Sequence, residues 1–224
     1  MDIIQKAKEE GRTILSEYES KEVLRAYDIP VTKEREVGDE ETLLLEAIRD
    51  IGFPLVLKGS GADLSHKTER GLVRVDIRNE EEAKTAFQGI MDELKDNGGR
   101  VLVQEMVKGE RELVVGLTYD DQFGPCVMFG LGGIFTEILK DISFRVAPLE
   151  KRDAMEMMQE IKARKILDSV RGMPAADLDK LCDILIKVGT IGLEQEAIKE
   201  IDINPVILSG DSPVAVDALV VLKS

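Results

Sequence analysis

Pro54-Leu-Val-Leu-Lys58, Gly59-Ser-Gly-Ala-Asp-Leu-Ser-His-Lys-Thr-Glu-Arg-Gly71 and Val73-Arg-Val-Asp-Ile77 follow one another in the chain and set its expected architecture. The first run is apolar and the last alternates apolar with polar residues, so both are predicted strands. The glycine-edged segment between them is typical of a long loop. This loop carries His66, the only histidine in 224 residues. Histidine can take up protons or form covalent intermediates, but many exposed histidines do neither, and the residue alone leaves both interpretations open.

The composition is that of an ordinary globular protein, with 43% hydrophobic and 33% charged residues. A formal net charge of −14 opposes binding to nucleic acid or anionic membrane, and the sequence shows no basic patch that would reverse this. Cys126 and Cys182 lack metal-ligand spacing, so we expect reduced core residues and a cytoplasmic protein. No apolar run approaches the ~18 residues that span a bilayer, and the first residues lack the apolar core of a signal peptide.

The order of predicted elements favours an α+β fold over the strict alternation of a doubly wound fold. Three strand-like runs at 101–107, 112–119 and 125–129 are joined by short turn-rich segments, which favour antiparallel pairing. The segment 96–100 is the best linker candidate, so we expect a first lobe of residues 1–98 and a second of residues 99–224. The remaining expected elements are helices within 1–28, 39–51, 79–96 and 150–193, and a closing hairpin of strands 198–203 and 214–222.

The closing hairpin carries the most informative polar residues after the His66 loop. Glu200, Asp202 and Asn204 alternate, so their side chains should leave one face of a strand. Asp217 interrupts the apolar run of the returning strand, and a buried carboxylate needs a cation. Asn204 and Asp217, facing each other, would offer the hard oxygen ligands of Mg²⁺. The alternative is an ion pair between Asp217 and a lysine or arginine elsewhere.

Other residues point less directly to a nucleotide. Lys58 ends a predicted strand, where its ammonium would either meet a phosphate oxygen at a cleft or stand in solvent. The extended run Val103–Val107 would suit an adenine edge, with Glu112 placed for ribose hydroxyls. The chain contains no phosphate-binding P-loop, and Gly130-Leu-Gly-Gly133 lacks the spacing of a dinucleotide fingerprint. Any nucleotide should therefore bind through another architecture.

Taken together, these motifs resemble the ATP-grasp β subunits of ADP-forming acyl-CoA synthetases, relatives of succinyl-CoA synthetase, and most of all those of the ADP-forming acetyl-CoA synthetases. The resemblance covers nearly the whole chain, from about residue 27 to residue 219. The matching segments are Gly52–Lys58, Ser65–Glu69, Val103–Val107, Glu112–Gly116, Phe123–Pro125, Phe129–Ile134, Asp141 with Arg145 and Pro148, Glu200–Pro205 and Ala215–Ala218.

The resemblance implies an ATP-grasp fold, in which two α+β lobes clamp a Mg-nucleotide. Carried over position by position, it gives each candidate a role: Lys58 would contact the nucleotide phosphates, Gln104, Glu105 and Val107 would line the adenine, Glu112 would reach the ribose, and Asn204 and Asp217 would hold Mg²⁺. His66 resembles the family's phosphohistidine, which passes phosphate to ADP, and Asp202 would orient its imidazole. The implied reaction is acyl-CoA + ADP + phosphate = carboxylic acid + CoA + ATP.

The implied partner is an α subunit that carries the CoA-binding domain and a first phosphohistidine, in an α2β2 assembly. Glu137 and Arg145 match a Gly-Gly-x-x-x-Glu segment and its following arginine, which would contact phosphate or that partner. One departure is Arg70-Gly71-Leu72, where the family pattern has a small apolar residue and two glycines. It motivates an alternative, a regulatory module that binds ATP and transfers nothing; a carboxylate–amine ligase of the same fold is a third possibility.

Overall fold

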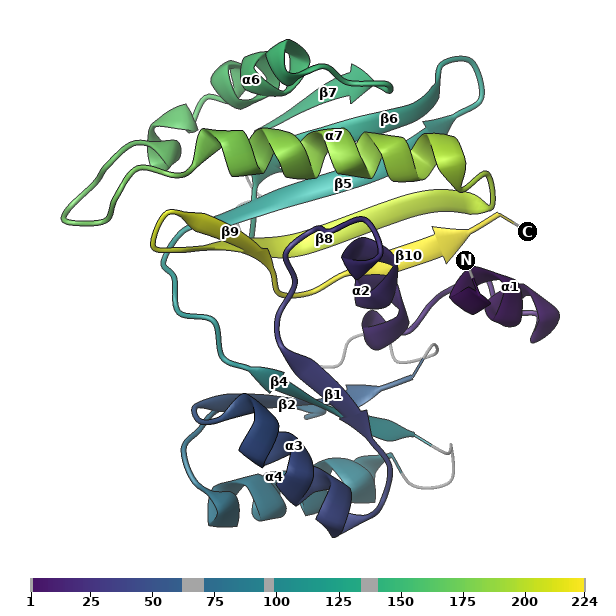
Figure 1. The fold of residues 1–224 in the computed structure, drawn as a ribbon, viewed down its shortest axis with the longest axis vertical. Helices are drawn as coiled ribbons and strands as arrows, with labels where there is room; N and C mark the ends of the chain where they lie inside the picture. Colours follow the sequence, from purple (N-terminus) through teal and green to yellow (C-terminus); the bar gives the residue numbers. More distant parts are fainter. Residues whose placement is uncertain (1, 62–70, 95–98, 134–140, 224) are drawn as a thin grey trace. The chain divides into compact units, whose positions relative to one another are not determined.

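The computed structural model describes residues 2–61, 71–94, 99–133 and 141–223 (Figure 1). Contacts divide the chain into a larger unit, made of Met1–Leu15, Glu19–Val31 and Val107–Ser224, and a smaller unit of Ser16–Tyr18 and Thr32–Met106. This division differs from the boundary expected after residue 98, because the strand at Arg100–Glu105 pairs within the smaller unit and the N-terminal helices belong mainly to the larger one. His66 and its loop lie outside the described residues.

The smaller unit is a four-stranded antiparallel sheet with two helices on one face (Figure 1). Alternating residues of the strands meet apolar residues of the helices in one core, which contains Leu57, Val103, Leu44 and Phe87. Asn79 is the N-cap of the second helix, and its side chain accepts a hydrogen bond from the Glu82 N–H. The elements are β1 (Glu34–Val37), α3 (Glu41–Ile51), β2 (Leu55–Ser60), β3 (Val73–Ile77), α4 (Glu80–Glu93) and β4 (Arg100–Glu105), with the strands in the order β1-β4-β2-β3.

The larger unit is a second antiparallel sheet with strand order β10-β8-β5-β6-β7, and β9 pairs with part of β8. Helices α6 and α7 lie across one face of this sheet (Figure 1). Its core includes Val115 and Phe129 from the strands and Leu185 and Val188 from α7. The elements are α1 (Asp2–Glu9), α2 (Glu17–Arg25), β5 (Glu112–Asp120), β6 (Gly124–Leu131), β7 (Ile142–Val146), α6 (Lys151–Glu160), a 3₁₀ helix (Arg164–Leu167), α7 (Leu178–Glu194), β8 (Ile198–Ser209), β9 (Ser212–Ala215) and β10 (Leu219–Leu222).

The predicted α+β class is confirmed, with several local differences. The expected antiparallel pairing holds for β5 with β6, but β4 pairs with β1 and β2. The closing hairpin is longer than expected, because β8 continues to Ser209 and the returning strand is interrupted between Ala215 and Leu219. Ser20 lies inside α2, and its hydroxyl oxygen accepts a hydrogen bond from the Val220 N–H.

Both cysteines are free thiols in the structure, with Cys182 buried and Cys126 half-buried. Burial raises the pKa of each thiol, which lowers its reactivity. Among the described helices, none combines the length and apolar character needed to cross a membrane.

Candidate functional site

The face of the large sheet opposite α6 and α7 contains a cavity of about 410 Å³. Asp202 pairs with Gly116 and Glu200 with Thr118, so β8 presents its acidic side chains beside small residues of β5. Met128 of β6 and Phe144 of β7 complete an apolar side of the cavity. A Cβ at Gly116 would lie 3.0 Å from Met128 Cε, so glycine leaves this space open. Glu200, Asp202 and Asn204 all line the cavity, in agreement with the shared strand face that their alternation predicts.

Asn204 and Asp217 occupy opposite positions of the closing hairpin. Asp202 pairs with Leu219 and Val206 with Ala215, and the same register puts residue 204 across from residue 217. The Val216 N–H donates to the Pro205 carbonyl oxygen at 3.0 Å, which holds the two chains together next to this position. The register therefore agrees with the predicted proximity of these two oxygen-bearing side chains.

The electrostatics of this region favour a cation. Burial, together with the charges of Glu200 and Asp217, raises the pKa of Asp202 to about 6. Within the described parts of the chain, no three His, Cys, Asp or Glu side chains form a metal-binding group. Asn204 and Asp217 therefore amount to a sparse set of protein ligands. Such a set fits Mg²⁺, which usually keeps several water molecules and binds substrate phosphates.

Glu112, the predicted ribose ligand, and Asn204 are linked by the two glycines that follow β6. The Gly132 N–H donates to the Glu112 carbonyl oxygen at 2.9 Å, and the Gly133 N–H donates to Asn204 Oδ1 at 3.1 Å. The Glu112 carboxylate itself packs against Gly133. The structure thus brings together a predicted nucleotide ligand and a predicted metal ligand from different strands.

Lys58 does not stand at an exposed strand end. It lies inside β2, is 7% exposed, and its Nζ is 2.6 Å from Oε1 of Glu17, which is 3% exposed. The solvated alternative for Lys58 is therefore wrong. Glu17 was not identified from the sequence as the partner of Lys58. The spacing of Glu17, Lys21 and Leu24 could have indicated that Glu17 is buried, because the three residues share one face of α2 and all are buried.

The predicted adenine-lining residues lie at and after the end of β4. Gln104 is 1% exposed and, by alternation with the core residue Val103, shares the sheet face of Lys58. Glu105 pairs with the chain before β1, because its carboxylate accepts from the Lys33 N–H at 2.8 Å. Val107 follows the strand, half-buried, in the segment assigned to the larger unit.

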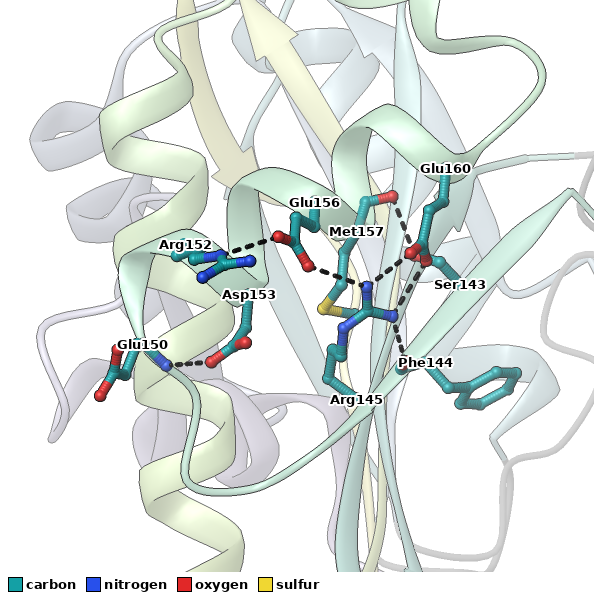
Figure 2. A network of polar contacts seen from close by, with 9 residues as sticks. All are labelled: Ser143, Phe144, Arg145, Glu150, Arg152, Asp153, Glu156, Met157 and Glu160. Atoms are coloured by element: carbon teal, nitrogen blue, oxygen red, sulfur yellow. Dashed lines mark hydrogen bonds and ion pairs between the residues drawn. The ribbon is translucent and has the colours of Figure 1, made fainter.

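Arg145 lies on the helix-covered side of the large sheet (Figure 2). Its guanidinium contacts Glu160 at 2.5 Å and Glu156 at 3.6 Å, both from α6, and donates to the Phe144 carbonyl oxygen. This pairing lowers the pKa of Glu160. Arg145 is therefore on the opposite face from the acidic cavity, and a direct contact with nucleotide phosphate is not supported. Glu137 lies outside the described residues.

Asp141 and Arg111 each hold several backbone groups with their side chains. The Asp141 carboxylate accepts from the N–H groups of Lys162 and Ala163, both at 2.7 Å, and so fixes the start of the 3₁₀ helix. Arg111, which sequence reasoning missed, is 4% exposed and donates to four carbonyl oxygens, those of Ile166, Asp168, Pro174 and Gly210. Both residues support the framework around the site.

The fold and the gathered residues define an ATP-grasp protein, because residues 6–222 match the family model described as the ATP-grasp domain. The β subunit of acetate–CoA ligase (ADP-forming) I from Pyrococcus furiosus is 46% identical, over 99% of this chain and 97% of its own length. With that degree of identity over nearly both full lengths, the chain belongs to the family of β subunits of ADP-forming acetate–CoA ligases.

Solved structures agree with this assignment. Acetyl-coenzyme A synthetase 1 of Ca. Korarchaeum cryptofilum, in complex with coenzyme A, Ca-AMPCP and HgCl⁺, is 44% identical with a TM-score of 0.93, and the match covers 99% of each chain. A second structure of that enzyme, with coenzyme A and Mg-AMPPCP, has a phosphohistidine segment that points towards its nucleotide-binding site. It is 43% identical with a TM-score of 0.89, again over 99% of each chain.

Proposed function

We propose that this chain is the β subunit of an ADP-forming acyl-CoA synthetase and transfers phosphate between His66 and ADP. The observation that carries the proposal is the proximity of three predicted ligands. Glu112 and Asn204 both contact Gly133, and the register of the closing hairpin puts Asp217 across from Asn204. Family membership supports it, since the Pyrococcus furiosus relative is named as an ADP-forming ligase subunit.

In the proposed reaction the protein's own residues mainly bind and position. In the direction of ATP synthesis, the P–N bond of phosphorylated His66 breaks as a β-phosphate oxygen of ADP forms the new P–O bond. In reverse, the neutral imidazole nitrogen attacks the terminal phosphorus of ATP and ADP leaves. Asp202 would accept the other imidazole N–H and so set the tautomer.

The nucleotide would be held by residues from several elements. Lys58 would neutralise phosphate charge, Gln104, Glu105 and Val107 would line the adenine, and Glu112 would accept hydrogen bonds from the ribose hydroxyls. Mg²⁺ bound by Asn204 and Asp217 would neutralise charge on the phosphate oxygens. Such catalysis works largely by positioning and electrostatic stabilisation.

The subunit would act with an α chain that carries the CoA-binding domain and the first phosphohistidine, in an α2β2 assembly. The acyl pocket would then lie on the α chain. The free thiols of Cys126 and Cys182 support a cytoplasmic location, where cysteines stay reduced.

Intact-mass analysis after incubation with Mg-ATP tests the proposal. We expect the wild type to gain one phosphate that is lost in acid, and His66→Ala to gain none. Equilibrium dialysis with radiolabelled ATP should show that both proteins still bind nucleotide, which separates loss of transfer from loss of binding.

The outcomes separate the proposed function from its alternatives. Nucleotide binding without a phosphoenzyme, even with the α chain present, would favour the regulatory module. A phosphoenzyme that persists in His66→Ala would move the carrier role to another residue. Product formation without any phosphoenzyme would favour a carboxylate–amine ligase.

A further inference from the structure

The segment Gly130-Leu-Gly-Gly133 is prominent in the sequence, yet it fits neither a P-loop nor a dinucleotide fingerprint. In the structure Gly130 and Leu131 end β6 and pair with β5, and Gly132 continues beside the first residue of β5. A Cβ at Gly132 would lie 2.5 Å from the Leu113 carbonyl oxygen, so the two backbones touch where side chains would normally separate them. The segment is thus pressed against β5, and its Gly132 N–H is bonded to the Glu112 carbonyl oxygen.

Gly133 fixes the orientation of the Asn204 side chain. Its N–H can only donate, so the atom of Asn204 that faces it, 3.1 Å away, is the amide oxygen Oδ1. The amide oxygen and nitrogen of an asparagine can be exchanged by a flip of the side chain, and this hydrogen bond decides which of the two atoms faces Gly133. An amide oxygen has two acceptor sites, so one remains for a cation.

The same glycine also accommodates Glu112. Gly133 has φ +62°, a conformation that residues with a Cβ rarely adopt, and a Cβ there would collide with Oε2 of Glu112. One backbone position therefore contacts the predicted ribose ligand on β5 and holds the predicted metal ligand on β8. Only glycine satisfies both neighbours.

We propose that Gly133 is a positioning residue that couples nucleotide binding at Glu112 to metal binding at Asn204. A ribose held by Glu112 fixes the carboxylate that packs on Gly133, and a fixed Gly133 keeps Asn204 Oδ1 in the orientation that a metal requires. Because coupling is reciprocal, metal bound at Asn204 should strengthen nucleotide binding by the same factor. The inference rests on the proposed function.

The test compares ATP affinity with and without Mg²⁺ in wild type, Gly133→Ala and a matched control. Gly124→Ala is the control, because Gly124 has φ +77° but a Cβ there meets no atom of the described residues within 4 Å. Both variants bear the backbone cost of a positive φ, whereas only Gly133→Ala displaces Glu112. Isothermal titration with ATP in EDTA and in excess Mg²⁺ gives the ratio of the two dissociation constants.

We expect the Mg²⁺ enhancement to fall at least about fivefold in Gly133→Ala, the lower end of typical couplings, and to be retained in Gly124→Ala. Glu112→Asp withdraws the carboxylate from Gly133 without adding a Cβ, and it should lose the enhancement in the same way. This second variant keeps the test decisive if Gly133→Ala does not fold.

If Mg²⁺ enhances ATP binding by Gly133→Ala and by Glu112→Asp as much as it does for the wild type, the coupling is overturned and the proposed function stays intact. An equal loss in Gly124→Ala would also overturn it, since backbone strain alone would then explain the effect. Failure of the wild type to bind ATP at all would refute the proposed function and the coupling together.

Discussion

At the scale of single residues, the Lys58–Glu17 pair is the most informative contact of the smaller unit. A buried ion that has lost its water needs an opposite charge nearby, and the Lys58 Nζ lies 2.6 Å from Glu17 Oε1. The pair also restrains a flexible lysine stem, so Lys58 would meet a phosphate with its ammonium already ordered. Lysine has three donors, so an ammonium that binds Glu17 can also donate to a phosphate oxygen.

Removal of Glu17 should be costly, because it takes away a carboxylate 2.6 Å from the buried Lys58 ammonium. We expect Glu17→Ala to lower the free energy of unfolding by about 3–5 kcal/mol. The double variant Glu17→Leu with Lys58→Met should recover most of this lost stability, but it should not transfer phosphate because it lacks the Lys58 ammonium. Urea unfolding and the phosphoenzyme assay measure the two properties. Glu41→Ala, which removes an exposed partner of Lys84, is the control. A loss below 1 kcal/mol in Glu17→Ala would show that the pair is not buried in solution.

Arg145 provides the opposite case, an arginine in a network that is open to solvent. Its side chain is 25% exposed and those of Glu156 and Glu160 about half, so water screens the ion pairs. We expect Arg145→Ala to change unfolding free energy by no more than about 1 kcal/mol and the ATP dissociation constant by less than twofold. A large loss of nucleotide affinity in titration calorimetry would contradict its placement beside α6.

At the scale of elements, Arg111 organises the chain between α6 and α7. Val170 and Met173 exchange backbone hydrogen bonds around Arg171 and Gly172, both with positive φ, which makes a tight two-residue turn. Arg111 binds carbonyl oxygens on both sides of this turn and one in the connection from β8 to β9. A single buried guanidinium therefore ties three segments together.

Arg111→Lys tests this role, since lysine keeps the charge but cannot span four carbonyl oxygens. Loss of two or more bonds to buried acceptors should cost about 2–4 kcal/mol. Hydrogen exchange at the Val170 and Met173 amides should accelerate, while the amides shared by β5 and β6 stay protected. Arg152→Lys is the matched control, because Arg152 is exposed and pairs only with Glu156 among the described residues. Equal exchange rates at the Val170 and Met173 amides in Arg111→Lys and Arg152→Lys would contradict the proposed role of Arg111.

The elements also show what the sequence could and could not predict. Alternation of Glu200, Asp202 and Asn204 placed them correctly on one face, because strand periodicity is a local property. The burial of Lys58 depends on Glu17, 41 residues away, and no local pattern encodes such a contact. The same holds for β4, whose partners β1 and β2 were chosen over the nearer β5. Strand β1 was missed because Val37 is its only apolar residue.

At the scale of the molecule, charge and core organisation matter most. The net charge of −14 repels a polyphosphate at long range, so nucleotide binding must depend on cations close to the ligand. Lys58 and a metal at Asn204 are the proposed sources. The two units have separate hydrophobic cores, one between its sheet and α3 with α4, the other between its sheet and α6 with α7.

Separate cores predict that the two units can lose structure independently. Phe87 belongs to the smaller core and Phe129 to the larger, and both are buried. Truncation of a buried phenylalanine to alanine costs about 3–5 kcal/mol through lost contacts and a cavity. If each core stabilises its own unit, Phe87→Ala should accelerate hydrogen exchange in β2 and β4 far more than in β5 and β6, and Phe129→Ala should do the reverse. Each variant is the control for the other. If either substitution accelerates hydrogen exchange equally in all four strands, the two units unfold as one cooperative body. The two cores would then be separate in their contacts but would not stabilise the units independently.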